Sequence, residues 1–375
     1  MQILFRFLVI ATALSILLAA CAPAAAPTPT PTSKPAAAPP AAPTAAKPAA
    51  PAPSPTAAAK PAAPTPAPAA AKPAKTEKVR VGITSPTGSY WTHWIAVRKG
   101  MFQDQALEAD AILTQDNAKE LQALVGGSLD VSLPSPPETA LAIKGGAKLV
   151  MVGNLFSKVP PYDLIAAKNV EKFSDVKGKR VGVSSMSGAT TMILIKILAA
   201  NDLKKGNYDL VMVGGTGARM AAIMNGSIAT GLIGPPQNFQ VQAEGFKSLG
   251  MSTDYFKDYQ FATMVVTRDW AQRNGEVLIR YLKAMYAASE WFYSPANKVE
   301  ASKILAEETK TTQELAEKTW DLYAKAGVFA RKGPVNLEGY KYVLQEMVES
   351  GDLPPADAVL DKLVDFSYLS KAGLQ

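Results

Sequence analysis

Two patterns of apolar residues alternate along the chain from residue 78 onward. Short runs such as Lys78–Ile83 place an apolar side chain at every second position, which is the period of a β-strand. Longer stretches such as Asn117–Val125 repeat apolar residues at intervals of three and four, which is the period of one helix face. Since the two patterns follow each other in turn, the sequence predicts βαβ units with parallel sheets and helices on both faces.

The alternation occurs twice, so we expect two α/β sheets, one in residues 78 to about 160 and one in residues 164–259. The remaining sequence begins with a predicted strand at Gln260–Val266 and then has the Met and aromatic stripes of core-forming helices. Asp269 and Thr311 are expected to cap two of these helices. Other predicted strands are 109–113, 130–133, 149–152 and 208–213, and further helices are predicted at 337–348 and 356–369.

The most informative junction is the turn between the strand that ends at Val183 and the helix that contains Met192. Three serines supply hydroxyl groups there, a glycine allows a guest to approach, and the first helical turn leaves N–H groups unpaired. Such a turn suits a small anion or a polar oxygen. An ordinary helix cap by Ser187 in a polar loop explains the same residues, because no phosphate-loop lysine follows Gly188.

The first 77 residues differ from the rest and contain 17 of the 29 prolines. Arg6 precedes an apolar run, Leu8–Leu18, which ends in Leu-Ala-Ala-Cys21. This arrangement resembles the lipobox of bacterial lipoproteins, whose cysteine is acylated and becomes the first residue after cleavage. We therefore expect a lipoprotein signal peptide over residues 1–21 and a membrane anchor at Cys21. A plain secretory peptide cut near Ala20 is the alternative.

Residues 22–77 consist almost entirely of Ala, Pro, Thr and Lys and cannot form a core. Proline at this density favours an extended conformation that rises ~3 Å per residue. We expect a disordered tether that holds the folded part on the order of 100 Å from a membrane, in the cell envelope and facing the periplasm or the extracellular side.

Charge and rare residues exclude several classes of function. Residues 1–77 hold six of the 39 basic and one of the 32 acidic residues, which leaves a net charge of +2 for residues 78–375. Binding to nucleic acid is therefore not expected. His93 is the single histidine, Cys21 is the single cysteine, and no Gly-x-Ser-x-Gly motif is present, so we predict neither catalysis nor a metal or cofactor. His93 is expected to be a packed or surface residue rather than a ligand contact.

Five segments follow one another in an order that resembles a known family. They are Val81–Ile83, Trp94–Phe102, Leu124–Asp130, Asp175–Gly182 and Ala221–Gly226. Over residues 78 to about 270 the chain is similar to the substrate-binding proteins of nitrate/sulfonate/taurine-type ABC importers, the SsuA/THI5-like or NMT1-like group. The resemblance implies a type II periplasmic-binding-protein fold, with two α/β lobes of mostly parallel sheets joined by two crossover strands.

The same resemblance implies the organisation and the partners of the protein. One lobe would consist of residues 78–163 and 260–375 with a helical tail, and the other of residues 164–259. The protein would act as a monomer, close its lobes on a small-molecule ligand, and deliver that ligand unaltered to ABC permease and ATPase subunits.

Ligands of open α/β sheets bind beyond the carboxyl ends of the strands, so the turns at those ends supply the candidate contacts. Arg219 either faces a ligand anion or forms a salt bridge within its lobe. The full set of candidate ligand-binding residues is Thr87, Gly88, Ser89, Tyr90, Ser135, Pro136, Ser185, Ser187, Gly188, Ala189, Thr190, Thr216, Arg219 and Gly234.

The chain departs from its relatives in ways that bear on the ligand. Gly234-Pro235-Pro236 stands where many relatives carry an acid, which argues against a ligand with an ammonium group. We therefore expect a small organic anion that resembles a sulfonate or nitrate. Two alternatives stay open: a planar ligand such as a thiamine pyrimidine precursor or an aromatic acid, stacked on Tyr90, Trp91 or Trp94, and a ligand-sensing lipoprotein that is not coupled to transport.

Overall fold

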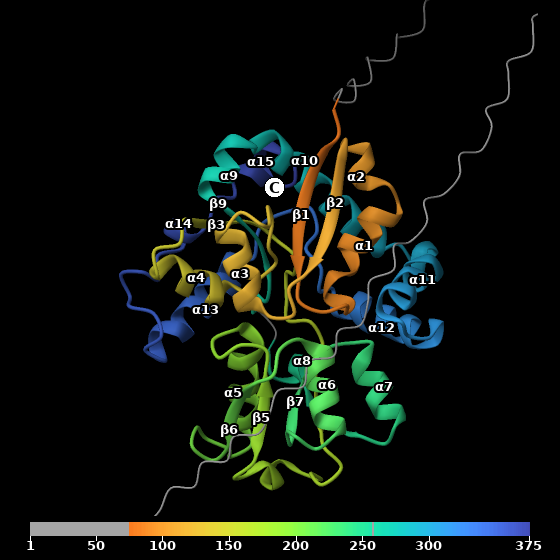
Figure 1. Ribbon diagram of the computed structural model, residues 1–375, viewed down its shortest axis with the longest axis vertical. Helices are drawn as coiled ribbons and strands as arrows, with labels where there is room; N and C mark the ends of the chain where they lie inside the picture. Colours follow the sequence, from red (N-terminus) through yellow and green to blue (C-terminus); the bar gives the residue numbers. More distant parts are fainter. Residues whose placement is uncertain (1–74, 257–258) are drawn as a thin grey trace, which may run out of the picture. The chain divides into compact units, whose positions relative to one another are not determined.

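The computed structural model describes residues 75–256 and 259–375 (Figure 1). The chain divides into Met1–Pro66 and Ala67–Gln375, and all described residues belong to the second part. The signal peptide, Cys21 and most of the tether expected from the sequence lie outside the described residues. Within the second part, two sheets form two lobes, which we call lobe 1 and lobe 2.

Lobe 1 is built on the first and last strands of the chain. Strands β1 (Glu77–Ile83) and β2 (Leu107–Leu113) pair in parallel, and β3 (Leu149–Asn154) pairs antiparallel with β9 (Thr263–Thr267). Residues 130–133 connect the two pairs through a parallel bridge, Val81 to Val131, and an antiparallel bridge, Ser132 to Val265. The strand expected over 130–133 is therefore present only as two single bridges.

Lobe 2, drawn in green in Figure 1, contains a five-stranded sheet in the order β6-β5-β7-β4-β8. Its strands are β4 (Asp163–Ala166), β5 (Arg180–Val183), β6 (Asp209–Met212), β7 (Thr230–Ile233) and β8 (Lys247–Met251). Strand β5 is parallel to both of its neighbours, and β4 is antiparallel to both of its neighbours.

In each lobe one described strand runs against the others. That strand is β9 in lobe 1 and β4 in lobe 2. Each is the first strand that the chain forms after it crosses from the other lobe, so the two crossings account for the antiparallel pairing. The expectation of two α/β lobes with mostly parallel sheets is confirmed. The described parts of the crossing segments are residues 155–162, Phe256 and residues 259–262. The two segments meet where Leu155 and Phe156 donate backbone hydrogen bonds to the Ala262 carbonyl.

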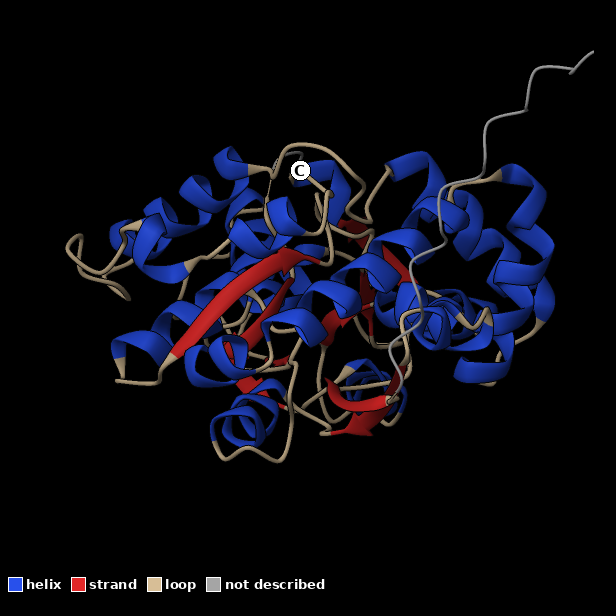
Figure 2. Ribbon diagram, turned by 90° about the horizontal axis from the view of Figure 1, so that it is seen from above, coloured by secondary structure: helices blue, strands red, loops and turns tan. Residues whose placement is uncertain are grey.

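Helices surround the strands (Figure 2) and supply many of the core residues of lobe 1. Trp91, fully buried, packs against Phe292 and Tyr323 and donates its indole N–H to the Ala301 carbonyl at 2.8 Å. The aromatic stripes of the C-terminal helices are thus core, as the sequence predicts. Lobe 1 carries α1 (Trp91–Arg98), α2 (Met101–Asp104), α3 (Asn117–Val125), α4 (Pro136–Lys144), α9 (Arg268–Arg273), α10 (Gly275–Phe292), α11 (Lys298–Thr309), α12 (Gln313–Ala326), α13 (Leu337–Glu349), α14 (Leu360–Leu363) and α15 (Ser367–Lys371). Lobe 2 carries α5 (Ala189–Ala200), α6 (Thr216–Met224), α7 (Gln237–Ala243) and α8 (Ser252–Tyr255). The described residues also form the 3₁₀ turns η1 (Gly88–Tyr90), η2 (Phe173–Val176) and η3 (Pro295–Asn297).

Two predicted helix caps are wrong by one or two residues. Helix α9 is capped by Thr267 rather than Asp269, because the Thr267 hydroxyl accepts the Trp270 N–H at 3.1 Å. Helix α12 is capped by Thr312 rather than Thr311, through the Leu315 N–H at 3.3 Å. In addition, the helix expected over 356–369 is divided into α14 and α15 by residues whose backbone pairs with β3: Asp365 donates to the Met151 carbonyl at 2.8 Å.

Candidate functional site

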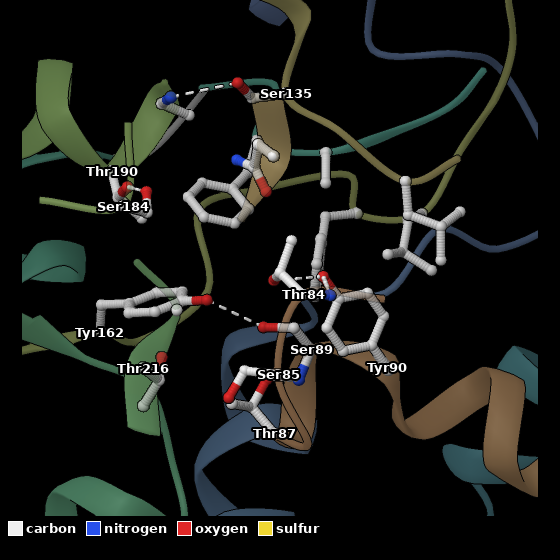
Figure 3. A pocket seen from close by; sticks show the side chains of 18 of the residues that line it. Thr84, Ser85, Thr87, Ser89, Tyr90, Ser135, Tyr162, Ser184, Thr190 and Thr216 are labelled. Carbon is white, nitrogen blue, oxygen red and sulfur yellow. Dashed lines mark hydrogen bonds between the residues drawn. The ribbon is translucent and has the colours of Figure 1, made fainter. Parts of the chain in front are cut away.

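A cavity of about 60 Å³ lies between the two lobes, beside the ends of β1, β3 and β5 (Figure 3). Residues of both lobes and of both crossing segments form its wall. The lining residues are Thr84, Ser85, Thr87, Ser89, Tyr90, Asn117, Leu133, Ser135, Leu155, Phe156, Tyr162, Ser184, Ala189, Thr190, Gly215, Thr216, Arg219, Phe261 and Ala262.

One side of the wall is made of hydroxyl groups that contact one another. The hydroxyls of Ser89 and Tyr162 lie 2.9 Å apart, and those of Thr84 and Tyr90 also lie 2.9 Å apart (Figure 3). The Tyr90 hydroxyl accepts the Thr84 backbone N–H at 3.1 Å. Because hydroxyls both donate and accept, this side of the cavity can reorient its protons to suit an acceptor or a donor of a guest.

Arg219 adds a positive charge to the same cavity. Its buried guanidinium donates to the carbonyl of Leu232 at 3.0 Å, to the carbonyl of Gly214, and to the Thr216 hydroxyl at 3.4 Å. Burial lowers the pKa of Arg219 to about 10, so the group stays charged at neutral pH. None of these partners is a carboxylate, and the salt bridge within lobe 2 that the sequence allowed is absent from the described residues. The positive charge is therefore uncompensated at the cavity wall.

Another part of the wall is apolar and aromatic. The rings of Phe156 and Phe261 meet edge to face at 5.7 Å, and Tyr162 lies 5.4 Å from Phe261. Leu133, Leu155 and Ala262 complete this surface. Trp91 and Trp94, which the sequence offered as stacking residues for a planar ligand, do not line the cavity, because both indoles are buried in lobe 1. Tyr90 does line it.

The Ser/Gly turn after β5 faces lobe 1 rather than open space. The Ala189 N–H, in the first turn of α5, donates to the Ser135 hydroxyl at 3.1 Å (Figure 3). The Ser185 hydroxyl donates to the Glu138 carboxylate at 2.5 Å. Gly188, not Ser187, is the N-cap of α5. Part of the turn's hydrogen-bonding capacity is thus used between the lobes.

Eight of the fourteen candidate residues line the cavity and six do not. The turns after β1, β5 and β6 and the start of α4 meet at one place, as expected from the carboxyl ends of parallel strands. The eight are Thr87, Ser89, Tyr90, Ser135, Ala189, Thr190, Thr216 and Arg219; the six are Gly88, Pro136, Ser185, Ser187, Gly188 and Gly234.

Three of the six outlying residues are glycines at close contacts. Gly88 donates its N–H to the Pro235 carbonyl at 2.9 Å, and a Cβ on Gly88 would lie 3.0 Å from that oxygen. A Cβ on Gly234 would lie 3.0 Å from the Tyr162 ring, and one on Gly188 would lie 2.6 Å from the Glu138 carboxylate. These residues let the segments around the cavity approach one another.

Sequence reasoning missed eleven lining residues. Thr84, Ser85, Ser184, Leu155 and Phe156 directly follow β1, β5 or β3, so the rule of strand ends could have found them. Leu133 and Gly215 also lie at strand ends that the sequence indicates, although neither was a candidate. The others had no local signal, because their position depends on how the lobes are connected or on residues brought together by the fold: Asn117, Tyr162, Phe261 and Ala262.

His93 lies away from the cavity, as expected. It is buried on α1 with its ring 5.6 Å from Phe102, and burial lowers its pKa to about 4. Among residues 75–256 and 259–375 no three His, Cys, Asp or Glu side chains are grouped so as to hold a metal ion. No helix of the described part combines the length and the apolar character needed to cross a membrane.

Two α/β lobes with a cavity at the carboxyl ends of their strands define the fold of the periplasmic solute-binding proteins. The nitrate-binding protein NrtA of Synechocystis PCC 6803 has a TM-score of 0.68 and 17% identity, over 81% of this chain and 89% of its own. The alkanesulfonate-binding protein SsuA of Xanthomonas axonopodis pv. citri, bound to MOPS, has a TM-score of 0.62 and 18% identity, over 79% and 99% of the two chains.

The family model described as NMT1/THI5 like matches residues 89–297, and the chain belongs to this family. The putative binding protein YtlA of Bacillus subtilis (strain 168) is 24% identical over 74% of this chain and 84% of its own length. A formylaminopyrimidine-binding protein of Halalkalibacterium halodurans is 20% identical over 53% and 61% of the two lengths. These relatives and structural neighbours are named as binding proteins.

Proposed function

We propose that this protein is an extracytoplasmic solute receptor that captures a small organic anion between its lobes and delivers it, chemically unaltered, to an ABC permease. The proposal adds a ligand class and a partner to what the periplasmic solute-binding fold indicates. The observation that carries it is the buried Arg219 guanidinium, which lines the cavity and has no carboxylate partner among the described residues. A charge in such a position favours an anionic guest, since a buried cation is stabilised by a counter-ion.

The apolar part of the wall refines the ligand class. Phe156, Phe261 and Leu155 offer no hydrogen-bonding groups to a guest, whereas the hydroxyls of Ser89 and Thr84 lie on the polar side. A ligand with one anionic end and a short apolar or aromatic body matches both parts of the wall. An organic sulfonate or carboxylate has this form. Nitrate would occupy the polar side alone.

A thermal-shift screen of sulfonates, nitrate, bicarbonate, pyrimidines and aromatic acids tests the proposal. A ligand at one hundred times its Kd adds ~2.7 kcal/mol to the free energy of unfolding, which raises the melting temperature measurably. Arg219→Gln should abolish the shift given by anions, measured against the variant's own ligand-free melting temperature. If no compound of the panel raises the melting temperature, the receptor function is contradicted.

A planar, neutral ligand is the second candidate, and the aromatic wall favours it. Tyr90, Phe156, Tyr162 and Phe261 all line the cavity and can stack on a flat ring. The relative named as a formylaminopyrimidine-binding protein supports the same class of ligand. The two candidates differ in one measurement: the thermal shift given by a pyrimidine should survive Arg219→Gln, whereas that given by a sulfonate should not.

We also propose that acylated Cys21 anchors the receptor to the membrane through the proline-rich segment. This rests on the sequence Leu-Ala-Ala-Cys21 alone, because these residues lie outside the described part. Cys21→Ser should release the protein into the soluble fraction of the cell envelope, and labelled fatty acid should be incorporated by the unmodified chain and not by the variant. Unchanged membrane association of Cys21→Ser would contradict the anchor.

A further inference from the structure

Glu138 is a buried carboxylate at the junction of the two lobes, and the ligand cavity does not use it. It lies in the first turn of α4 and is 6% exposed. It is absent from the cavity wall, although its neighbours Ser135 and Asn117 belong to that wall. Its hydrogen bonds to Ser135 cap α4 within lobe 1, but this cap does not account for its contact with lobe 2.

Every described partner of Glu138 is a hydrogen-bond donor. The Asn117 amide donates to the two carboxylate oxygens at 2.7 and 2.9 Å. The backbone N–H and the hydroxyl of Ser135 donate at 3.2 and 2.6 Å. The Ser185 hydroxyl, which belongs to lobe 2, donates at 2.5 Å. Such a set of donors matches an ionised carboxylate, which accepts hydrogen bonds and donates none.

The lobe 2 turn is shaped to receive this carboxylate. Gly188 has no side chain where a Cβ would lie 2.6 Å from Glu138 Oε1 and 2.6 Å from Ser185 Oγ. Next to it, Ala189 donates its N–H to the Ser135 hydroxyl, which itself donates to Glu138. The serine, the glycine and the N–H group at the start of α5 are the features of an anion-binding turn. The anion that they face is the carboxylate of the other lobe.

We propose that Glu138 is a positioning residue that latches lobe 1 to lobe 2 and stabilises the closed arrangement even without ligand. Closure brings a charge-assisted hydrogen bond from Ser185 to Glu138, which opening breaks, while the contacts of Asn117 and Ser135 lie within lobe 1 and persist. The latch holds Ser135 and Ala189 together at the cavity wall.

The experiment measures the distance between the lobes without ligand, in the full chain carrying Cys21→Ser and one spin label on each lobe. Asp110→Cys on β2 and Asp209→Cys on β6 provide exposed positions. The spin-labelled protein without a substitution at Ser185 or Glu138 should show the distance of closed lobes. Ser185→Ala leaves the α4 cap intact and removes only the hydrogen bond from Ser185 to Glu138, and it should lower the ratio of closed to open molecules about tenfold. Glu138→Gln should do the same, because its amide N–H groups would face other donors.

Glu120→Gln is the matched control, since Glu120 is a buried acid of lobe 1 whose hydrogen bonds come from Thr114, Ser132 and Leu133 of the same lobe. It should leave the distance distribution unchanged. The latch is overturned if Ser185→Ala leaves the distribution unchanged, if it shifts toward the closed distance, or if the unmodified protein shows no closed-lobe distance. The latch concerns the cleft of the proposed function, but the measurement uses no ligand. A failed ligand screen and a failed latch are therefore separate results.

Discussion

At the scale of single residues, Ser187 and Thr190 look equivalent in the sequence of the turn after β5, but only Thr190 lines the cavity. The Thr190 hydroxyl lies 2.8 Å from that of Ser184. Thr190→Ala should weaken the binding of any ligand found in the screen by about fivefold to tenfold, the usual effect of one lost hydrogen bond. Ser187→Ala serves as the control and should bind as the unmodified protein does. Equal affinities of the two variants in calorimetry would remove Thr190 from the site.

Two buried titratable residues predict how stability changes with pH. Burial lowers the pKa of His93 to about 4, so stability is lost as pH falls from 6.5 toward 4. Burial raises the pKa of Glu120 to about 7, despite hydrogen bonds from Ser132 and Leu133, so stability is lost as pH rises from 4.5 toward 7. Each effect amounts to about 3 kcal/mol, and the two oppose each other between pH 4.5 and 6.5.

Single variants should reveal the two opposing effects. In urea unfolding, His93→Leu should leave a protein that is less stable at pH 6.5 than at pH 4.5, relative to the unmodified chain. Glu120→Gln should give the opposite slope, because His93 then acts alone. If both variants keep the pH dependence of the unmodified protein, neither group titrates as its burial indicates.

Individual residues also mark the limit of what the sequence predicts. The turn after β5 is visible in the sequence as a site suited to an anion, and the structure places Ser185 against a carboxylate. The sequence identifies Glu138 only as part of a helix cap, since its spacing from Ser135 accounts for that role. Ser185 lies 47 positions from Glu138 in the chain. Their contact depends on how the two lobes meet, so no local sequence pattern indicates it.

At the scale of elements, most strands and their succession along the chain were predictable, because two-residue periodicity and turn residues are local features of the sequence. The caps of α9 and α12 were displaced because neighbouring threonines and an aspartate compete for the same N–H groups. Of the three aromatic residues Phe156, Tyr162 and Phe261, only Phe156 closely follows a strand, β3, and could be expected at the cavity. Tyr162 and Phe261 lie farther along the crossing segments, which become part of a site only through the pairing of β3 with β9.

Two glycines at the start of α6 give a prediction about lobe closure. A Cβ on Gly215 would lie 2.9 Å from the Ser85 Cβ and 3.1 Å from the Thr84 carbonyl of lobe 1, whereas the nearest atom to a Cβ on Gly217 is 3.8 Å away. Gly215 has φ of −61°, so alanine is not strained within lobe 2. Gly215→Ala should therefore lower affinity, measured by calorimetry, at least about tenfold by holding the lobes apart.

Gly217→Ala is the matched control for this effect. It lies inside α6, where alanine favours the helix by up to about 1 kcal/mol, and it should leave affinity unchanged. A Gly215→Ala protein that binds as tightly as Gly217→Ala would show that the lobes close without the contact between Gly215 and lobe 1.

At the scale of the whole molecule, the two lobes share one large apolar cluster, beside a smaller one within lobe 2 that includes Ile165 and Ile223. A single cluster of buried residues includes Val79 and Leu282 of lobe 1 and Val181 and Ile193 of lobe 2. The crossing segments contribute Phe156 to the same cluster. Shared core residues couple the unfolding of the lobes, so the described part should unfold in one cooperative step.

This coupling predicts how a ligand changes thermal unfolding. A ligand in the cavity touches side chains of both lobes, so its binding free energy stabilises the entire unit and not one lobe. At one hundred times the Kd, calorimetry should show one transition that moves upward by several degrees, without a second transition left at the ligand-free temperature. An inert salt at the same ionic strength is the control for unspecific effects of charge. Two transitions of which only one moves would mean that the lobes unfold separately and that the ligand is held by one of them, which contradicts capture between the lobes.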